Sequence, residues 1–184
     1  MTADLDAPLV RAARSGDVGA FERLVERHRE VVTRVAARVV GEDDAEDVAQ
    51  DAFLRAFHRL EAFRDEAAFR TWLLTIAHNA ALDAAAGRPA ADPLSSEDGP
   101  LAPGSPVEQL ERRERLRRLD LKLKGLSPTH RAVLVLRDVE GLSYEEIAEV
   151  TGSPLGSVKA RLHRARGELI ELLRTNTYDW DLPR

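Results

Sequence analysis

The 184-residue sequence contains no cysteine, which excludes disulfide bonds and thiolate metal sites. Aromatic residues make up only 5% of the chain, and its apolar positions are filled mainly by leucine, valine and alanine, which suit the packing of helix against helix. No stretch approaches the roughly 20 consecutive apolar residues that a membrane-spanning helix requires. The first ten residues are acidic where a signal peptide would be basic. We therefore expect a cytoplasmic protein with no membrane insertion.

Charge is distributed unevenly along the chain, whose net charge is −5. Residues 1–86 carry 16 acidic and 11 basic side chains, whereas residues 107–174 carry 11 acidic and 14 basic ones. Between them, residues 87–106 contain five prolines and three glycines, a composition that cannot hold a packed core. The sequence predicts an all-α protein with two small helical domains, residues 8–86 and 107–174, joined by a flexible linker, 87–106. A tail, 175–184, follows.

The first domain has the apolar periodicity of helices. Residues 7–40 predict helices interrupted at Ser15-Gly16-Asp17, a break that contains an N-cap candidate, and Gly41 ends the run. A second helix is predicted at residues 45–62 and a third at residues 68–86, after a loop. Each of these two predicted helices has polar side chains outside its apolar stripe, and such residues are usually interpreted as a solvent-exposed face.

The second domain contains a predicted helix-turn-helix. Ser127 and Pro128 begin a helix that is expected to run to Val139. A capping box at Ser143 begins the next helix, and Gly152 lies in the turn before the last helix, residues 154–173.

On a helical wheel, the last helix has one narrow apolar face formed by Val158, Leu162, Ala165 and Leu169. The rest of its surface carries small and cationic residues, a pattern that lets a helix approach DNA and contact both phosphates and base edges. We therefore predict a DNA-reading helix rather than a merely cationic surface helix. Its candidate DNA-binding residues are Ser157, Lys159, Ala160, Arg161, His163, Arg164 and Arg166.

Three stretches resemble one family in sequence and in order: DAEDVAQDAFLRAF, FRTWLLTIAHNAALD and LSPTHRAVLVLRDVEGLSYEEIAEVTGSPLGSVKARLHRAR. They resemble an extracytoplasmic-function (ECF, group 4) sigma factor of the sigma-70 family, whose members bind core RNA polymerase and direct it to promoters. The resemblance implies that the two domains are sigma regions 2 and 4. It also implies that the helix-turn-helix reads the minus-thirty-five element.

The resemblance assigns two further groups of residues. The helix at 45–62 resembles the segment that docks on the clamp coiled coil of the largest polymerase subunit, while the flap region is the other expected polymerase contact. The implied polymerase-binding residues are Asp47, Gln50, Asp51, Leu54 and Arg55. The loop 64–68 and the helix after it resemble the part that melts the minus-ten element and holds a flipped base. The implied minus-ten residues are Arg64, Phe69, Arg70, Trp72, Asn79 and Asp83. For Phe69 and Trp72, core packing and base stacking remain alternatives.

The chain departs from the family after Asp83, where a run of arginines is usual and the sequence reads AAAGRPAAD. With only Arg88 there, we expect minus-ten binding to be weaker or more dependent on the other domain. The tail TNTYDWDLPR has no counterpart in the resemblance.

Three other functions fit the sequence less well. A stand-alone helix-turn-helix regulator explains neither the acidic domain nor the linker, and an anti-sigma or adaptor protein would lack the basic helix. An enzyme is disfavoured because the five histidines are scattered and no phosphate-binding loop or nucleophile motif is present. We expect no catalytic residues, metal or cofactor. ECF members are often held by an anti-sigma factor, but no feature of the sequence identifies one.

Overall fold

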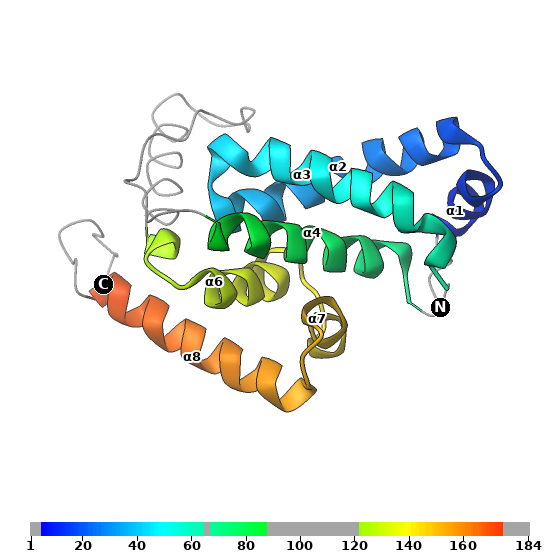
Figure 1. Cartoon of the computed structure of the whole chain (residues 1–184). Helices are drawn as coiled ribbons and strands as arrows, with labels where there is room; N and C mark the ends of the chain where they lie inside the picture. The colour runs from blue at the N-terminus through cyan, green and yellow to red at the C-terminus, as the bar shows by residue number, and fades with distance from the viewer. Residues whose placement is uncertain (1–4, 65–66, 88–121, 175–184) are drawn as a thin grey trace, which may run out of the picture.

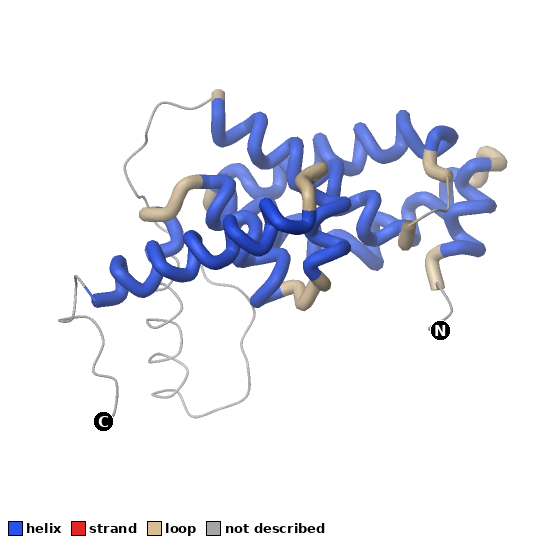
Figure 2. The backbone as a smooth tube through the Cα atoms, turned by 90° about the horizontal axis from the view of Figure 1, so that it is seen from below, coloured by secondary structure: helices blue, strands red, loops and turns tan. Residues whose placement is uncertain are grey.

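The computed structural model describes residues 5–64, 67–87 and 122–174, and every regular element in these ranges is helical (Figure 1). The predicted all-α class is therefore confirmed for this part of the chain, and Figure 2 shows its helices joined by short loops. Residues 88–106 of the predicted linker and the tail lie outside the described ranges. None of the described helices is long and apolar enough to span a membrane.

The N-terminal unit consists of α1 (Ala7–Arg14), α2 (Val18–Val40), α3 (Glu42–Arg59), the short 3-10 helix Leu60–Ala62, and α4 (Phe69–Ala86). Its boundaries follow the predicted caps. Asp17 accepts a hydrogen bond from the Ala20 backbone N–H at 3.0 Å, and Gly41 turns the chain between α2 and α3 at a φ of +96°.

The core of this unit forms where α2, α3 and α4 pack against one another. Fully buried side chains include Leu24 and Val35 of α2, Ala52 of α3 and Leu73 of α4. A buried polar contact holds α1 in place, since the His28 ring lies 2.7 Å from the Asp6 carboxylate, which also accepts a hydrogen bond from Arg27. Pairing of this kind is what makes a buried carboxylate tolerable.

The C-terminal unit consists of α6 (Pro128–Leu134), a π-helical turn (Val135–Val139), α7 (Tyr144–Thr151) and α8 (Leu155–Arg174). The predicted caps are present: Ser127 accepts from the His130 N–H, Ser143 and Glu146 form the capping box, and Gly152 is left-handed at φ +58°. One expectation differs from the structure. The sequence predicted a continuous α-helix to Val139, but the α-helix ends at Leu134 and a wider π-helical turn follows, in which each backbone hydrogen bond spans one residue more than in an α-helix.

The two units pack together into one body. α7 lies against α4, and α6 lies against α2 and α4 (Figure 1). The Arg131 guanidinium donates to the carbonyl oxygen of Val39 at 3.0 Å, joining the start of the C-terminal unit to the end of α2. As a result α4 is buried on most of its circumference. Leu74, His78 and Ala81 are buried beside Leu73.

Candidate nucleic-acid and protein-binding surfaces

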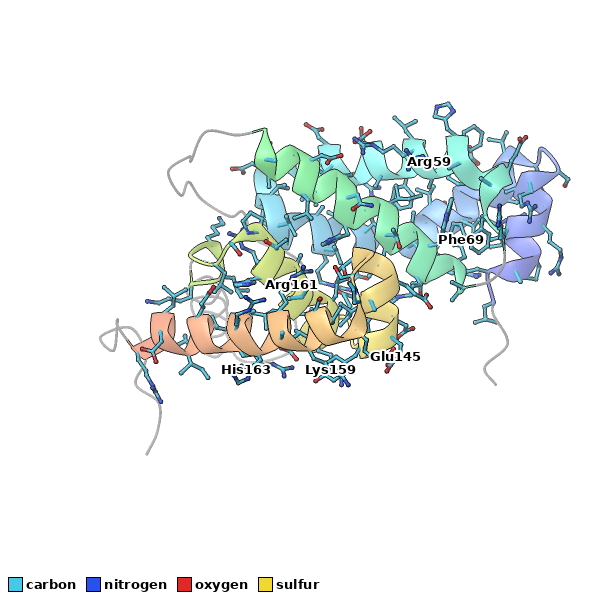
Figure 3. All side chains as sticks on the ribbon, turned by 60° about the horizontal axis from the view of Figure 1, so that its bottom comes forward. Arg59, Phe69, Glu145, Lys159, Arg161 and His163 are labelled. Atoms are coloured by element: carbon cyan, nitrogen blue, oxygen red, sulfur yellow. The ribbon has the colours of Figure 1, made fainter. Side chains whose placement is uncertain are left out.

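The outer face of α8 displays the predicted DNA-binding residues. Val158, Leu162 and Ala165 are buried and Leu169 is partly buried, which confirms the predicted apolar face. On the opposite side Ser157, Lys159, Ala160, His163, Arg164 and Arg166 are exposed. In Figure 3, Lys159 and His163 lie on the edge of α8 away from the rest of the molecule. A helix with this sidedness can enter a major groove while its own core remains intact.

Two arginines of α8 differ from this pattern. Arg166 donates to Asp138 at 2.6 Å, and the pKa of Arg166 is raised chiefly by that hydrogen bond. Both side chains are close to half-exposed, so a DNA phosphate could compete with the carboxylate for this cation. Arg161 is only half-exposed, and it donates a hydrogen bond to the Ser153 hydroxyl at 3.4 Å.

The exposed side of α3 carries the predicted polymerase-binding residues. Asp47, Gln50 and Leu54 are exposed, whereas Asp51 and Arg55 are half-buried. Leu54 is 60% exposed, and the exposed Phe57 follows it on the next turn. Large apolar side chains exposed among carboxylates are characteristic of a surface that binds another protein.

Arg55 connects this surface to α4. It lies 2.7 Å from Asp51 and 3.1 Å from Asp83, and these two hydrogen bonds raise the pKa of the Arg55 guanidinium, with Asp51 as the larger cause. The predicted docking helix and the predicted minus-ten helix therefore share one ion-pair network.

An aromatic cavity lies at the start of α4. It has a volume of about 590 Å³ and is lined by Ala62, Phe63, Arg64, Ala67, Thr71, Trp72, Thr75 and Glu149. Phe63, Phe69 and Trp72 pack against one another with ring centroids 5.1–5.8 Å apart. Phe69 is 1% exposed and belongs to the core beneath this cavity, whereas Trp72 is half-buried and lines it. Of the two alternatives, core packing and base stacking, core packing describes Phe69 in this structure. Trp72 has one face packed against the core and another that is accessible from the cavity.

The other predicted minus-ten residues lie along α4. Asn79 and Asp83 are exposed further along the helix and do not line the aromatic cavity. Arg70 is half-buried and is hydrogen-bonded to Glu140 of the C-terminal unit at 3.2 Å. The structure thus brings Arg64 and Trp72 together, while Asn79 and Asp83 form a separate polar edge.

Comparison with known proteins decides the family. Residues 24–88 match the model of sigma-70 region 2, and residues 116–169 match that of sigma-70 region 4. The ECF RNA polymerase sigma-E factor of Escherichia coli (strain K12) is 38% identical over 172 residues, covering 88% of this chain and 90% of the relative. The sigma-E factor of Haemophilus influenzae is 36% identical over 177 residues, covering 90% and 93%. The chain is an ECF sigma factor of the sigma-70 family.

The sigma factor directs transcription initiation by RNA polymerase and is not an enzyme. The region 2 match spans most of α2 together with α3 and α4, and the region 4 match includes α6, α7 and most of α8. A stand-alone regulator, the alternative kept from the sequence, is excluded because relatives match both units together.

Two solved structures have the same fold. CnrH, in complex with the cytosolic domain of CnrY, matches with a TM-score of 0.71 at 31% identity, covering 93% of this sigma factor and 98% of that chain. RpoE of Bartonella quintana, in complex with the anti-sigma factor NepR, matches with a TM-score of 0.66 at 26% identity, covering 84% and 96%.

His78 of the sigma factor was not singled out by the sequence. It is 3% exposed on α4, and its Nδ1 has no hydrogen-bond partner within the described residues. Burial, and to a smaller extent the nearby positive charge of Arg161, lowers the pKa of His78 to about 4. No local signal could have identified this residue, because its burial depends on the packing of region 4.

We expect His78 to make the sigma factor less stable in acid. The unfolded chain binds a proton at this histidine below pH 6.5, while the folded chain does so only near pH 4. The free energy of unfolding should therefore fall as the pH drops from 6.5 to 4, by up to about 3 kcal/mol from this residue. Urea unfolding of the wild type and of His78→Gln across this range measures the effect. Parallel pH profiles for the two proteins would contradict it.

Proposed function

We propose a division of labour among three surfaces of the sigma factor. In this proposal α3 docks on the clamp coiled coil of the largest polymerase subunit through Asp47, Gln50, Asp51, Leu54 and Arg55. The aromatic cavity and α4 bind the melted minus-ten element, with Arg64, Arg70, Trp72, Asn79 and Asp83 as contacts. α8 reads the minus-thirty-five element, and the flap region of the polymerase holds region 4. The boundaries 8–86 and 107–174 belong to the same proposal.

The observation that carries the proposal is the sidedness of α8. Its cations and small residues are exposed on the face opposite Val158 and Leu162, which are buried in the core of region 4. Nothing in the packing of region 4 requires Lys159 or Arg164 to be cationic, since neither has an ion-pair partner among the described residues. Free cations beside exposed small residues match the phosphate and base-edge requirements of a groove-reading helix.

The aromatic cavity supports the minus-ten assignment. A base extracted from the stack needs a concave site with an aromatic face and a nearby cation for its phosphate. Trp72 supplies the face and Arg64 the cation, and Phe69 and Phe63 hold the indole from below.

An anti-sigma factor is a further proposed partner. Support comes from CnrH and RpoE, whose structures are complexes that cover most of the length of this chain. Both include region 2 and region 4 in the matched length.

Run-off transcription tests the proposed division. The sigma factor and core RNA polymerase are incubated with a library of genomic fragments, and the transcribed fragments are sequenced. We expect them to share two separated sequence elements, one for each DNA-binding surface. Transcribed fragments that shared only one element would contradict the assignment of the other surface.

A further inference from the structure

The carboxylate of Glu140 connects region 4 to two helices of region 2, α2 and α4. Glu140 follows the π-helical turn, and its side chain is only 4% exposed. One of its oxygens lies 2.7 Å from Nε of Arg34 on α2, and the other lies 3.2 Å from Nη2 of Arg70 on α4. A single side chain of region 4 thus compensates two half-exposed cations of region 2.

The π-helical turn brings Glu140 to this position. The Glu140 N–H bonds to the carbonyl of Val135 at 2.9 Å, and Gly141 then reverses the chain at a φ of +72°. Leu142 returns to the core with an N–H bond to the carbonyl of Leu136 at 3.0 Å. Single-turn π-helices frequently occur at functional positions because the extra residue redirects the side chain that follows.

The same packing covers the proposed minus-ten surface. Glu149 of α7 forms part of the wall of the aromatic cavity, together with Arg64 and Trp72. Figure 3 shows the elements of region 4 lying along α4, with Arg161 of α8 on the side that faces it. A DNA strand approaching this cavity would meet the carboxylate of Glu149 and would find Arg70 already paired. The docking helix α3 instead packs on α2 and α4, and its outer face is exposed.

The two arginines respond differently to the loss of Glu140. Arg34 also pairs with Glu30, one helical turn away, at 2.8 Å. Arg70 has no carboxylate partner other than Glu140 among the described residues. Removing Glu140 therefore frees Arg70 above all, and a phosphate is the other anion that this guanidinium can bind.

We propose that Glu140 is an autoinhibitory latch: it holds region 4 on α4, where Arg70 and the aromatic cavity are closed to DNA. This inference rests on the proposed minus-ten surface. Because Arg70 cannot pair with Glu140 and a phosphate at once, minus-ten DNA and the closed arrangement compete, and a shift of population couples DNA binding to opening. The polymerase-docking face is accessible in the closed arrangement, so docking does not require opening.

The first experiment measures opening. Because the chain has no cysteine, spin labels can be placed specifically at Glu22→Cys on α2 and Ile170→Cys on α8 of the full-length protein. Pulsed electron resonance then gives the distance distribution for the wild type, Glu140→Gln and Glu145→Gln. Glu145 is an exposed residue of α7, so its variant loses the same charge without touching region 2. We expect a longer-distance population in Glu140→Gln alone.

The second experiment measures exposure of the minus-ten surface. The probe is a fluorescein-labelled pool of random single-stranded DNA, titrated with the unlabelled proteins. Glu140→Gln should bind it about tenfold more tightly than Glu145→Gln, because a paired cation becomes free. Adding Arg70→Ala to Glu140→Gln should remove the gain.

Two results would overturn the latch. One is an identical distance distribution in wild type and Glu140→Gln. The other is opening without an Arg70-dependent gain in DNA binding. The run-off assay separates these failures from failure of the proposed function, because it reports promoter elements whether or not the free protein is closed.

Discussion

Replacing Lys159 and Arg164 together with alanine is expected to lower the affinity of the polymerase holoenzyme for its promoter at least about thirtyfold, since each lost base or phosphate contact is worth at least about 1 kcal/mol. Both side chains are exposed on the outer face of α8. The buried face of α8 is formed by other residues, so region 4 should remain folded. Binding of labelled promoter DNA by the reconstituted holoenzyme measures the loss.

Arg174→Ala is the matched control for this double variant. Arg174 is exposed at the end of the same helix and lies 3.2 Å from Glu171. The Arg174→Ala variant also loses a positive charge from α8, but at a distance from the proposed DNA-reading face. The dependence of affinity on salt should become shallower in the double variant, because fewer counterions are released, and should remain unchanged in Arg174→Ala. Equal promoter affinities for the two variants would remove α8 from the DNA interface.

Gln50→Ala combined with Asp51→Lys is expected to weaken the complex with core RNA polymerase by at least about a hundredfold. Reversing one interfacial charge and truncating its neighbour removes favourable contacts and adds repulsion toward whatever cation the polymerase presents. Within α3, the new lysine would also lie one turn from Arg55, which keeps its second partner, Asp83. Titration of fluorescently labelled sigma factor with core enzyme measures the affinity.

Glu145→Lys serves as the control for the docking variant. It makes the same charge reversal on an exposed position of region 4, away from α3. Circular dichroism of each variant checks that the helices are retained. If the Gln50 and Asp51 variant binds core enzyme as tightly as Glu145→Lys does, the docking surface lies elsewhere on the molecule.

Local features of the fold were predictable because they depend on neighbouring residues. The N-caps at Asp17, Ser127 and Ser143 each form the expected hydrogen bond, and Gly152 takes the left-handed conformation that its turn needs. The buried face of α8 also followed from spacing alone. In each case the deciding interaction spans no more than a few turns of one helix.

The arrangement of region 4 on region 2 could not be predicted in this way. It depends on contacts such as those of Glu140 with Arg34 and Arg70, which are 106 and 70 residues away in the sequence. Apolar periodicity gave α4 one core face, and it cannot show that a second partner buries Leu74 and His78 as well. The π-helical turn was missed for a related reason, since a single extra residue in one turn leaves the apolar pattern almost unchanged.

Helix α4 carries a different kind of charged contact on each of two sides. On the side toward α3, Arg55 joins Asp51 and Asp83, and both hydrogen bonds favour a guanidinium that is already charged throughout the physiological pH range. On the side toward region 4, His78 is held neutral by burial, and acid would place a positive charge beside Arg161. Protonation of His78 therefore destabilises the contact between regions 2 and 4, and acid stress would favour the separation of the two regions.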